Sequence, residues 1–118
     1  MNESILIVED DLDTLELLEN YFKRYEYQVL TAEFGEEAVS TATERPPDLV
    51  ILDIRLPDID GYEVCRRLTS QQRTSNIPII FLTEKRERDS RIAGLQLGAV
   101  DYISKPFDIH ELRLRVEN

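Results

Sequence analysis

The chain has 118 residues, 42% of them apolar, and its 24 acidic residues outnumber 14 basic ones, which gives a formal net charge of −10. This length suffices for one domain with a single core, whereas the excess of acids argues against direct binding to nucleic acid or to an anionic membrane surface. Cys65 is the one cysteine, so an intrachain disulfide is excluded and a place in the core is expected. The N-terminus lacks the pattern of a secretory signal, and no apolar run approaches the roughly 20 residues that span a bilayer. We therefore expect a cytoplasmic protein.

Strand-like and helical patterns alternate along the chain. Short runs rich in apolar residues predict five strands, at residues 4–9, 27–32, 48–53, 77–83 and 100–104. The segments between and after them predict five helices, at residues 11–25, 35–44, 60–71, 86–97 and 107–117. In the first helix, a buried stripe is expected from residues at helical spacing: Leu12, Leu15, Leu18 and Phe22.

This alternation of strands and helices predicts an α/β fold. The strands at 48–53 and 77–83 are almost continuously apolar, as expected for strands covered on both faces. Right-handed connections then favour a doubly wound, five-stranded parallel sheet with five helices. In such sheets ligands bind outside the carboxyl ends of the strands. The residues that end each strand are therefore the first candidates for a functional site.

Charged or hydroxyl side chains end four of the five predicted strands: Glu9 and Asp10, Asp53, Thr83, and Lys105. Carboxylates crowded at one edge would repel one another by on the order of a few kcal/mol a pair, so a cation must compensate. Oxygen ligands with room for water suit Mg²⁺, and Lys105 adds a compact charge suited to a phosphate. A carboxylate beside Mg²⁺, Lys105 and a hydroxyl is a candidate phosphoryl acceptor.

Four stretches then carry a resemblance to a known family: ILIVEDD, LVILDIRLPDIDGYEVCRRL, IPIIFLT and GLQLGAVDYISKPF. In this order and spacing they make essentially the whole chain resemble the receiver domain of two-component response regulators. The resemblance implies a flavodoxin-like sheet with the strand order 2-1-3-4-5 and a single receiver domain over residues 1–118.

The resemblance also implies a phosphoacceptor and a set of metal ligands. Asp53 would accept a phosphoryl group from the phosphohistidine of a sensor histidine kinase or from a phosphotransfer protein. Asp10 and Asp53 would bind Mg²⁺ directly, Glu9 would bind it through water, and Arg55 would offer its backbone carbonyl. Asp11 is expected to cap the first helix instead.

Three further positions match the residues that respond to the phosphoryl group. Lys105 would contact it, and the Thr83 hydroxyl would form a hydrogen bond to it. Tyr102 occupies the aromatic switch position and would turn inward as Thr83 moves. By family precedent the bond between Lys105 and Pro106 would be cis, although most such bonds are trans.

Phosphorylation would shift the face formed by residues 86–97, 100–104 and 107–117 toward an active form, for output or for homodimerisation. We expect no enzymatic activity beyond self-phosphorylation and dephosphorylation. The short last helix favours a domain cut from a longer protein with a C-terminal output domain. Within that helix His110 is expected to be exposed, and Leu114 lies off the apolar stripe and is a candidate for a partner contact.

Glu84 departs from the family pattern, which usually has a small residue there. Its carboxylate would either crowd the phosphoryl pocket or point to solvent and pair with Lys85 or Arg86. The alternative function is therefore a degenerate receiver, a scaffold that is never phosphorylated.

Two other classes are disfavoured. A phosphatase of the haloacid dehalogenase type needs an Asp two residues after the nucleophile, where Arg55 stands. A flavin or nucleotide binder needs a phosphate-binding loop where EDDLD would repel phosphate.

Overall fold

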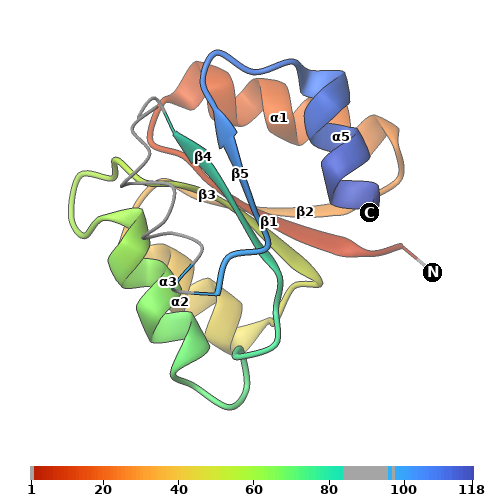
Figure 1. The fold of residues 1–118 in the computed structure, drawn as a ribbon. Coiled ribbons are helices and arrows are strands. Elements are labelled where there is room, and N and C mark those ends of the chain that lie inside the picture. The colour runs from red at the N-terminus through yellow and green to blue at the C-terminus, as the bar shows by residue number, and fades with distance from the viewer. Residues whose placement is uncertain (1, 84–95, 97) are drawn as a thin grey trace.

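Five parallel strands form the central sheet, in the order β2-β1-β3-β4-β5 (Figure 1). The computed structural model describes residues 2–83, 96 and 98–118. The strands are β1 (Ser4–Val8), β2 (Gln28–Ala32), β3 (Leu49–Asp53), β4 (Ile79–Thr83) and β5 (Asp101–Ser104). The predicted doubly wound sheet and its flavodoxin-like strand order are confirmed.

Four helices lie within the described part of the chain: α1 (Leu12–Arg24), α2 (Gly35–Glu44), α3 (Gly61–Thr69) and α5 (Ile109–Glu117). Each begins and ends within two residues of its predicted limits. The helix predicted at 86–97 falls outside the described residues, Gln96 apart. Among the described helices none is long and apolar enough to cross a bilayer.

The helices cover both faces of the sheet, with α1 and α5 on one side and α2 and α3 on the other (Figure 1). Successive side chains of β1 alternate between these two sides: Ile5 and Ile7 pack toward α1 and α5, and Leu6 and Val8 pack toward α2 and α3. The side-chain period of two therefore places apolar groups in both cores, which explains why the strands read as continuous apolar runs.

The buried stripe of α1 is shorter than expected. Leu15, Leu18 and Phe22 are buried, but Leu12 is 60% exposed. The prediction for Leu12 is wrong because α1 begins at this residue, directly after the carboxyl end of β1, so its first turn lies at the rim of the sheet rather than over it.

Gly61 allows α3 to begin directly against the end of β3. A Cβ atom at this position would lie 2.4 Å from the Asp53 carbonyl oxygen and 2.8 Å from the Ile54 Cα. The Gly61 N–H instead donates to the Ile54 carbonyl at 2.8 Å, and Asp60 caps the helix by accepting from the Glu63 N–H. The absence of a side chain at Gly61 thus sets how closely the chain packs behind Asp53.

Cys65 lies in the core, as predicted, and is fully buried on α3. Burial raises the pKa of its thiol to about 11. At pH 8 the folded protein should therefore carry far less thiolate than an exposed cysteine, whose pKa is about 8.5.

We expect iodoacetamide at pH 8 to alkylate the folded protein at least about 100-fold more slowly than the protein in guanidinium chloride. Intact mass over time gives both rates without ambiguity, since the chain has one cysteine. Similar rates in the two conditions would contradict the buried position of Cys65.

Candidate phosphoacceptor and metal site

Carboxylates from two neighbouring strands meet at one edge of the sheet. Val8 of β1 pairs with Leu52 of β3, so the next residues, Glu9 and Asp53, lie side by side. Carboxylate oxygens of these two residues and of Asp10 all lie within 4.8 Å of one another. Glu9 and Asp53 are buried and Asp10 is exposed at the rim. The local sequence explains this: a buried strand ends and its polar residues follow at once.

Lys105 links the two buried carboxylates. Its Nζ lies 2.5 Å from Glu9 Oε1 and 2.9 Å from Asp53 Oδ2. Glu9 and Asp53 are 2% and 5% exposed, so both ion pairs are shielded from bulk water. Charges buried to this degree are tolerated only when they are paired. Lys105 therefore holds together a cluster that would otherwise repel itself.

The negative charge of the cluster remains unfavourable even with Lys105 in contact with both carboxylates. Burial raises the pKa of Glu9 to about 7; the charge on Asp53 adds to the rise, and the hydrogen bond from Lys105 opposes it. Burial alone would lower the pKa of Lys105, but its hydrogen bonds to Glu9 and Asp53 outweigh this and raise that pKa above its ordinary value. The site therefore carries more negative charge than one ammonium group balances.

The backbone after β3 orients the Asp53 carboxylate. The Arg55 N–H donates to Asp53 Oδ1 at 3.1 Å, while Oδ2 accepts from Lys105. The loop from Ile54 to Asp60 is anchored in turn by Asp58, whose carboxylate accepts from the Gly35 and Glu36 N–H groups at 2.7 and 2.8 Å. Asp53 is thus held at Oδ1 by a loop that is itself tied to the start of α2, and at Oδ2 by Lys105.

A cavity of about 200 Å³ opens over the cluster, lined by Glu9, Asp10, Asp11, Asp53, Arg55 and Lys105. Its donors are hard oxygens, and its volume leaves room for water, which together suit Mg²⁺ better than a transition metal. Glu9, Asp10 and Asp53 are the residues that would hold such an ion. The structure therefore brings together every predicted metal ligand, with Arg55 at the cavity wall.

Two further predicted site residues are Thr83 and Tyr102. Thr83 ends β4 beside Ser104, as expected, but its side chain falls outside the described part of the structure, as do Glu84, Lys85 and Arg86. Tyr102 is 8% exposed, with its ring centroid 6.4 Å from that of Phe81. The roles of Thr83 and Tyr102 remain predictions.

Two smaller expectations have clear outcomes. The bond between Lys105 and Pro106 is cis, as the resemblance implied.

Asp11 occupies the N-cap position of α1, but its carboxylate accepts no backbone hydrogen bond there. It accepts instead from the Thr14 hydroxyl at 2.5 Å. The predicted position is confirmed and the predicted capping bond is wrong, because a nearby hydroxyl competes for the same oxygen.

Sequence reasoning missed two features of the site. Asp58 is one, because its partners on α2 lie 22 and 23 residues away and leave no local signal. The other is an exposed apolar surface beside Lys105. Leu17 is 58% exposed, and a shallow cavity of about 380 Å³ lies between Leu17 and the segment from Lys105 to Ile109. In the sequence, this surface was indicated only by Leu17, a leucine of α1 that lies outside the apolar stripe of that helix.

Removing one carboxylate should stabilise the metal-free protein. We expect Asp53→Asn to raise the free energy of unfolding at pH 8 by on the order of 1 kcal/mol in EDTA, because less charge is then crowded around Glu9. Mg²⁺ should stabilise the unchanged protein and have a smaller effect on the variant. Urea unfolding followed by circular dichroism measures both effects.

Glu16→Gln is the matched control, since Glu16 is an exposed acid on α1. Its stability should respond to Mg²⁺ as the unchanged protein does. An Asp53→Asn variant that is less stable than the unchanged protein in EDTA would mean that the ion pair with Lys105 outweighs the repulsion.

Comparison with known proteins agrees with this geometry. Residues 5–117 match the family described as the response regulator receiver domain. The chain is 44% identical over 117 residues to the alkaline phosphatase synthesis transcriptional regulatory protein PhoP of Bacillus subtilis, covering 99% of this chain and 48% of PhoP. It is 41% identical to the phosphate regulon transcriptional regulatory protein PhoB of Pseudomonas aeruginosa, covering 99% of this chain and 51% of PhoB. The chain thus spans about half the length of these curated relatives.

Solved structures show the same fold. The non-phosphorylated HemR receiver domain from Leptospira biflexa superposes with a TM-score of 0.91 at 34% identity, covering 98% of this chain and 92% of that one. The receiver domain of the sensor histidine kinase PA1611 from Pseudomonas aeruginosa, which has a magnesium ion coordinated in its active-site cleft, superposes with a TM-score of 0.90 at 32% identity, covering 99% and 96%. The acidic cluster at the strand ends, the sheet order and these matches lead to one conclusion: the chain belongs to the response regulator receiver domain family.

Proposed function

We propose that the protein acts in phosphorelay signalling by accepting a phosphoryl group on Asp53 in an Mg²⁺-dependent reaction. The observation that carries this proposal is the contact between Lys105 Nζ and Asp53 Oδ2 at 2.9 Å. It puts a cation within reach of any group attached to that oxygen, and the carboxylate lies at the wall of a cavity that a donor can enter.

The proposed reaction forms one bond and breaks one. An Asp53 carboxylate oxygen attacks the phosphorus of a phosphohistidine, the P–N bond breaks, and the imidazole leaves with a proton from solvent. Asp53 needs no general base because an ionised carboxylate is already a nucleophile. Mg²⁺, held by Asp10 and Asp53, by Glu9 through water and by the Arg55 carbonyl, would neutralise charge on the phosphoryl oxygens.

Lys105 has a second role in this proposal. In the structure its ammonium is divided between Glu9 and Asp53. Once Asp53 carries a phosphoryl group, Lys105 would move its hydrogen bond to a phosphoryl oxygen, which is a stronger acceptor with more charge. Thr83, at the end of β4, would donate a hydrogen bond to another oxygen of the same group.

The apolar surface beside the cavity supports a protein as phosphoryl donor. Leu17 on α1 is 58% exposed and lines a shallow cavity together with Lys105, Pro106, Phe107 and Ile109. Exposed apolar groups that gather near a reactive residue are typical of a docking site. We assign this surface to the sensor histidine kinase or phosphotransfer protein that donates to Asp53.

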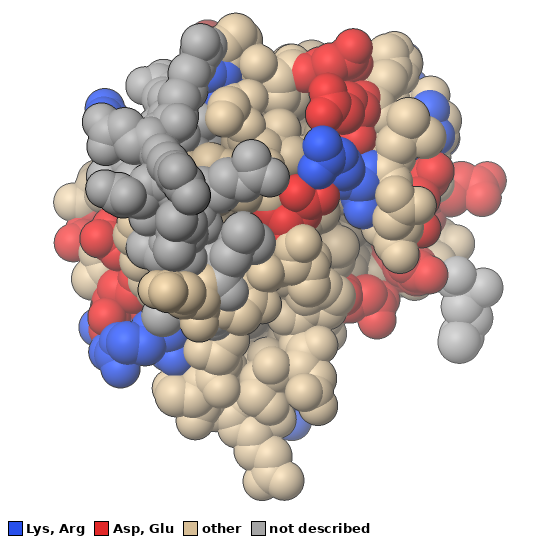
Figure 2. Space-filling model, viewed as in Figure 1, with Lys and Arg blue, Asp and Glu red and all other residues tan. Residues whose placement is uncertain are grey.

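Output would pass through β5 and α5 together with the segment at 86–97. Figure 2 shows acidic and basic side chains side by side over α5, where Arg115 pairs with Asp101 at 2.6 Å and with Glu111 at 3.2 Å. In our proposal phosphorylation would shift Tyr102 and rearrange such pairs, for homodimerisation or for contact with a C-terminal output domain. Leu114, 56% exposed on the same helix, is available for that contact.

We therefore expect the protein incubated with acetyl phosphate and Mg²⁺ to gain the mass of one phosphoryl group, measured on the intact chain. Asp53→Asn should show no gain, and neither should the unchanged protein in EDTA. This pattern also fits a protein whose chemistry is limited to its own phosphorylation and dephosphorylation.

The other outcomes separate the alternatives. Labelling that survives Asp53→Asn would place the acceptor elsewhere and overturn the proposal. No labelling, together with no Mg²⁺ binding by calorimetry, would identify a degenerate receiver that serves as a scaffold. Mg²⁺ binding without labelling calls for a phosphorylated histidine kinase as donor in the same assay, and failure there would overturn the proposal as well.

A further inference from the structure

The first turn of α2 is capped by a residue from another loop. Phe34 occupies the N-cap position and makes no side-chain hydrogen bond there. The Gly35 and Glu36 N–H groups donate instead to the Asp58 carboxylate, one to each oxygen, at 2.7 and 2.8 Å. Burial acts to raise the pKa of Asp58, but the hydrogen bonds from the Glu36 and Gly35 N–H groups help to hold that pKa below its ordinary value. Asp58 thus supplies, from the loop after β3, the acceptor that the N-cap residue lacks.

Two further contacts join this loop and α3 to the start of α2. A Cβ atom at Gly35 would lie 2.4 Å from Ile59 Cγ1 and 3.0 Å from the Ile59 carbonyl oxygen. The glycine therefore lets α2 begin directly against the loop. At the surface, Arg67 of α3 pairs with Glu36 of α2. A carboxylate cap, a close packing contact and an ion pair thus hold the loop from Ile54 to Asp60 and the helix after it against α2.

The loop that Asp58 fastens carries two groups of the phosphoacceptor site. The Arg55 N–H donates to Asp53 Oδ1 at 3.1 Å, and the Arg55 carbonyl is the backbone ligand proposed for Mg²⁺. Asp58 is three residues further along the same loop, and it is not among the residues that line the cavity over Asp53. Any effect of its hydrogen bonds on the site must therefore pass through the loop backbone.

We propose that Asp58 is a positioning residue for the metal site. By fastening the loop to α2, it holds the Arg55 carbonyl, and the bond from Arg55 to Asp53, in the geometry that Mg²⁺ requires. Mg²⁺ demands near-ideal octahedral coordination, and a loop that is fixed in advance need not be ordered when the ion binds. The inference rests on the proposed function, because it takes Asp53 to be part of an Mg²⁺ site.

The test is a calorimetric titration of Mg²⁺ in the absence of any phosphoryl donor. Asp58→Ala removes both acceptor oxygens and should weaken Mg²⁺ binding at least about 3-fold. Asp58→Asn removes the same charge but keeps an oxygen that caps helices well, so its affinity should stay within about 2-fold of that of the unchanged protein. The pair therefore separates a role in positioning the loop from a role of the negative charge alone.

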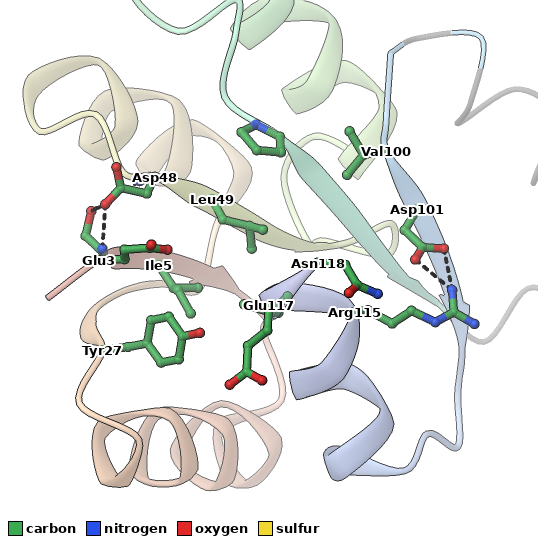
Figure 3. Close-up of a pocket in the computed structure, with 13 residues that line it drawn as sticks. Glu3, Ile5, Tyr27, Asp48, Leu49, Val100, Asp101, Arg115, Glu117 and Asn118 are labelled. Carbon is green, nitrogen blue, oxygen red and sulfur yellow. Dashed lines mark hydrogen bonds and ion pairs between the residues drawn. The ribbon is translucent and has the colours of Figure 1, made fainter.

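Asp48→Ala is the matched control. Asp48 is also exposed, and its carboxylate also accepts from a backbone N–H, that of Ser4, at 2.8 Å (Figure 3). It precedes β3, whereas Asp53 ends that strand, so it lies at the opposite edge of the sheet. This variant should bind Mg²⁺ as the unchanged protein does, even if it is less stable.

A second measurement uses the reciprocity of coupled sites. If the cap favours Mg²⁺ binding, saturating Mg²⁺ should slow the exchange of the Gly35 and Glu36 amides with solvent at least about 3-fold relative to EDTA, as followed by NMR. The Ser4 amide, which donates to Asp48, should exchange at the same rate in both conditions. A cap that only stabilised α2 would give no such dependence on the metal.

The outcomes distinguish this inference from the proposed function. Equal Mg²⁺ affinity in Asp58→Ala and the unchanged protein, equal weakening in Asp58→Ala and Asp58→Asn, or amide exchange that ignores Mg²⁺ would overturn the role of Asp58 alone. The expected affinities without labelling of Asp53 by any phosphoryl donor would support that role and overturn the proposed function. An unchanged protein that binds no Mg²⁺ would overturn both.

Discussion

The contact of one ammonium group with two buried carboxylates is the constraint on which the site depends. Lys105 lies against both Glu9 and Asp53, and Asp10 adds a third carboxylate at the rim. Burial raises the pKa of Glu9 to about 7, and the charge on Asp53 adds to the rise although Lys105 opposes it. The cluster therefore holds unfavourable charge repulsion that a divalent cation would relieve, and it keeps Asp53 Oδ2 in contact with the Lys105 ammonium.

The sheet makes this arrangement possible because the residues that stabilise the fold and the residues of the site occupy different parts of the strands. Every strand of the sheet buries apolar side chains in one or both cores, so the polar residues that end β3 or follow β1 and β5 need not contribute to packing. Parallel strands bring these residues to one edge. Gly61 and Asp58 then fix the loop behind Asp53 through a close backbone approach and two backbone hydrogen bonds.

The sequence predicted the elements well because strand and helix periods differ and polar residues mark the strand ends. It located Glu9, Asp10, Asp53 and Lys105 for the same reason, whereas Arg55 and the roles of all five residues came from the family resemblance. The sequence did not predict hydrogen bonds between residues far apart in the chain: nothing near Asp58 indicates that its carboxylate accepts from the start of α2. The sequence also did not predict the exposure of Leu12, because this residue continues the apolar spacing of α1 but lies at the rim of the sheet. The bond from Asp11 to Thr14 shows that side-chain competition is decided only in three dimensions.

The most direct test of this account is a calorimetric titration of Mg²⁺ into the unchanged protein, Lys105→Met and, as a control, Lys23→Met, which removes an exposed lysine of α1. If Lys105 and the metal share the same carboxylates, the unchanged protein should bind one Mg²⁺. Lys105→Met should then bind it at least about 3-fold more tightly, and Lys23→Met should match the unchanged protein. Absence of Mg²⁺ binding, or equal affinity in Lys105→Met and the unchanged protein, would contradict the account.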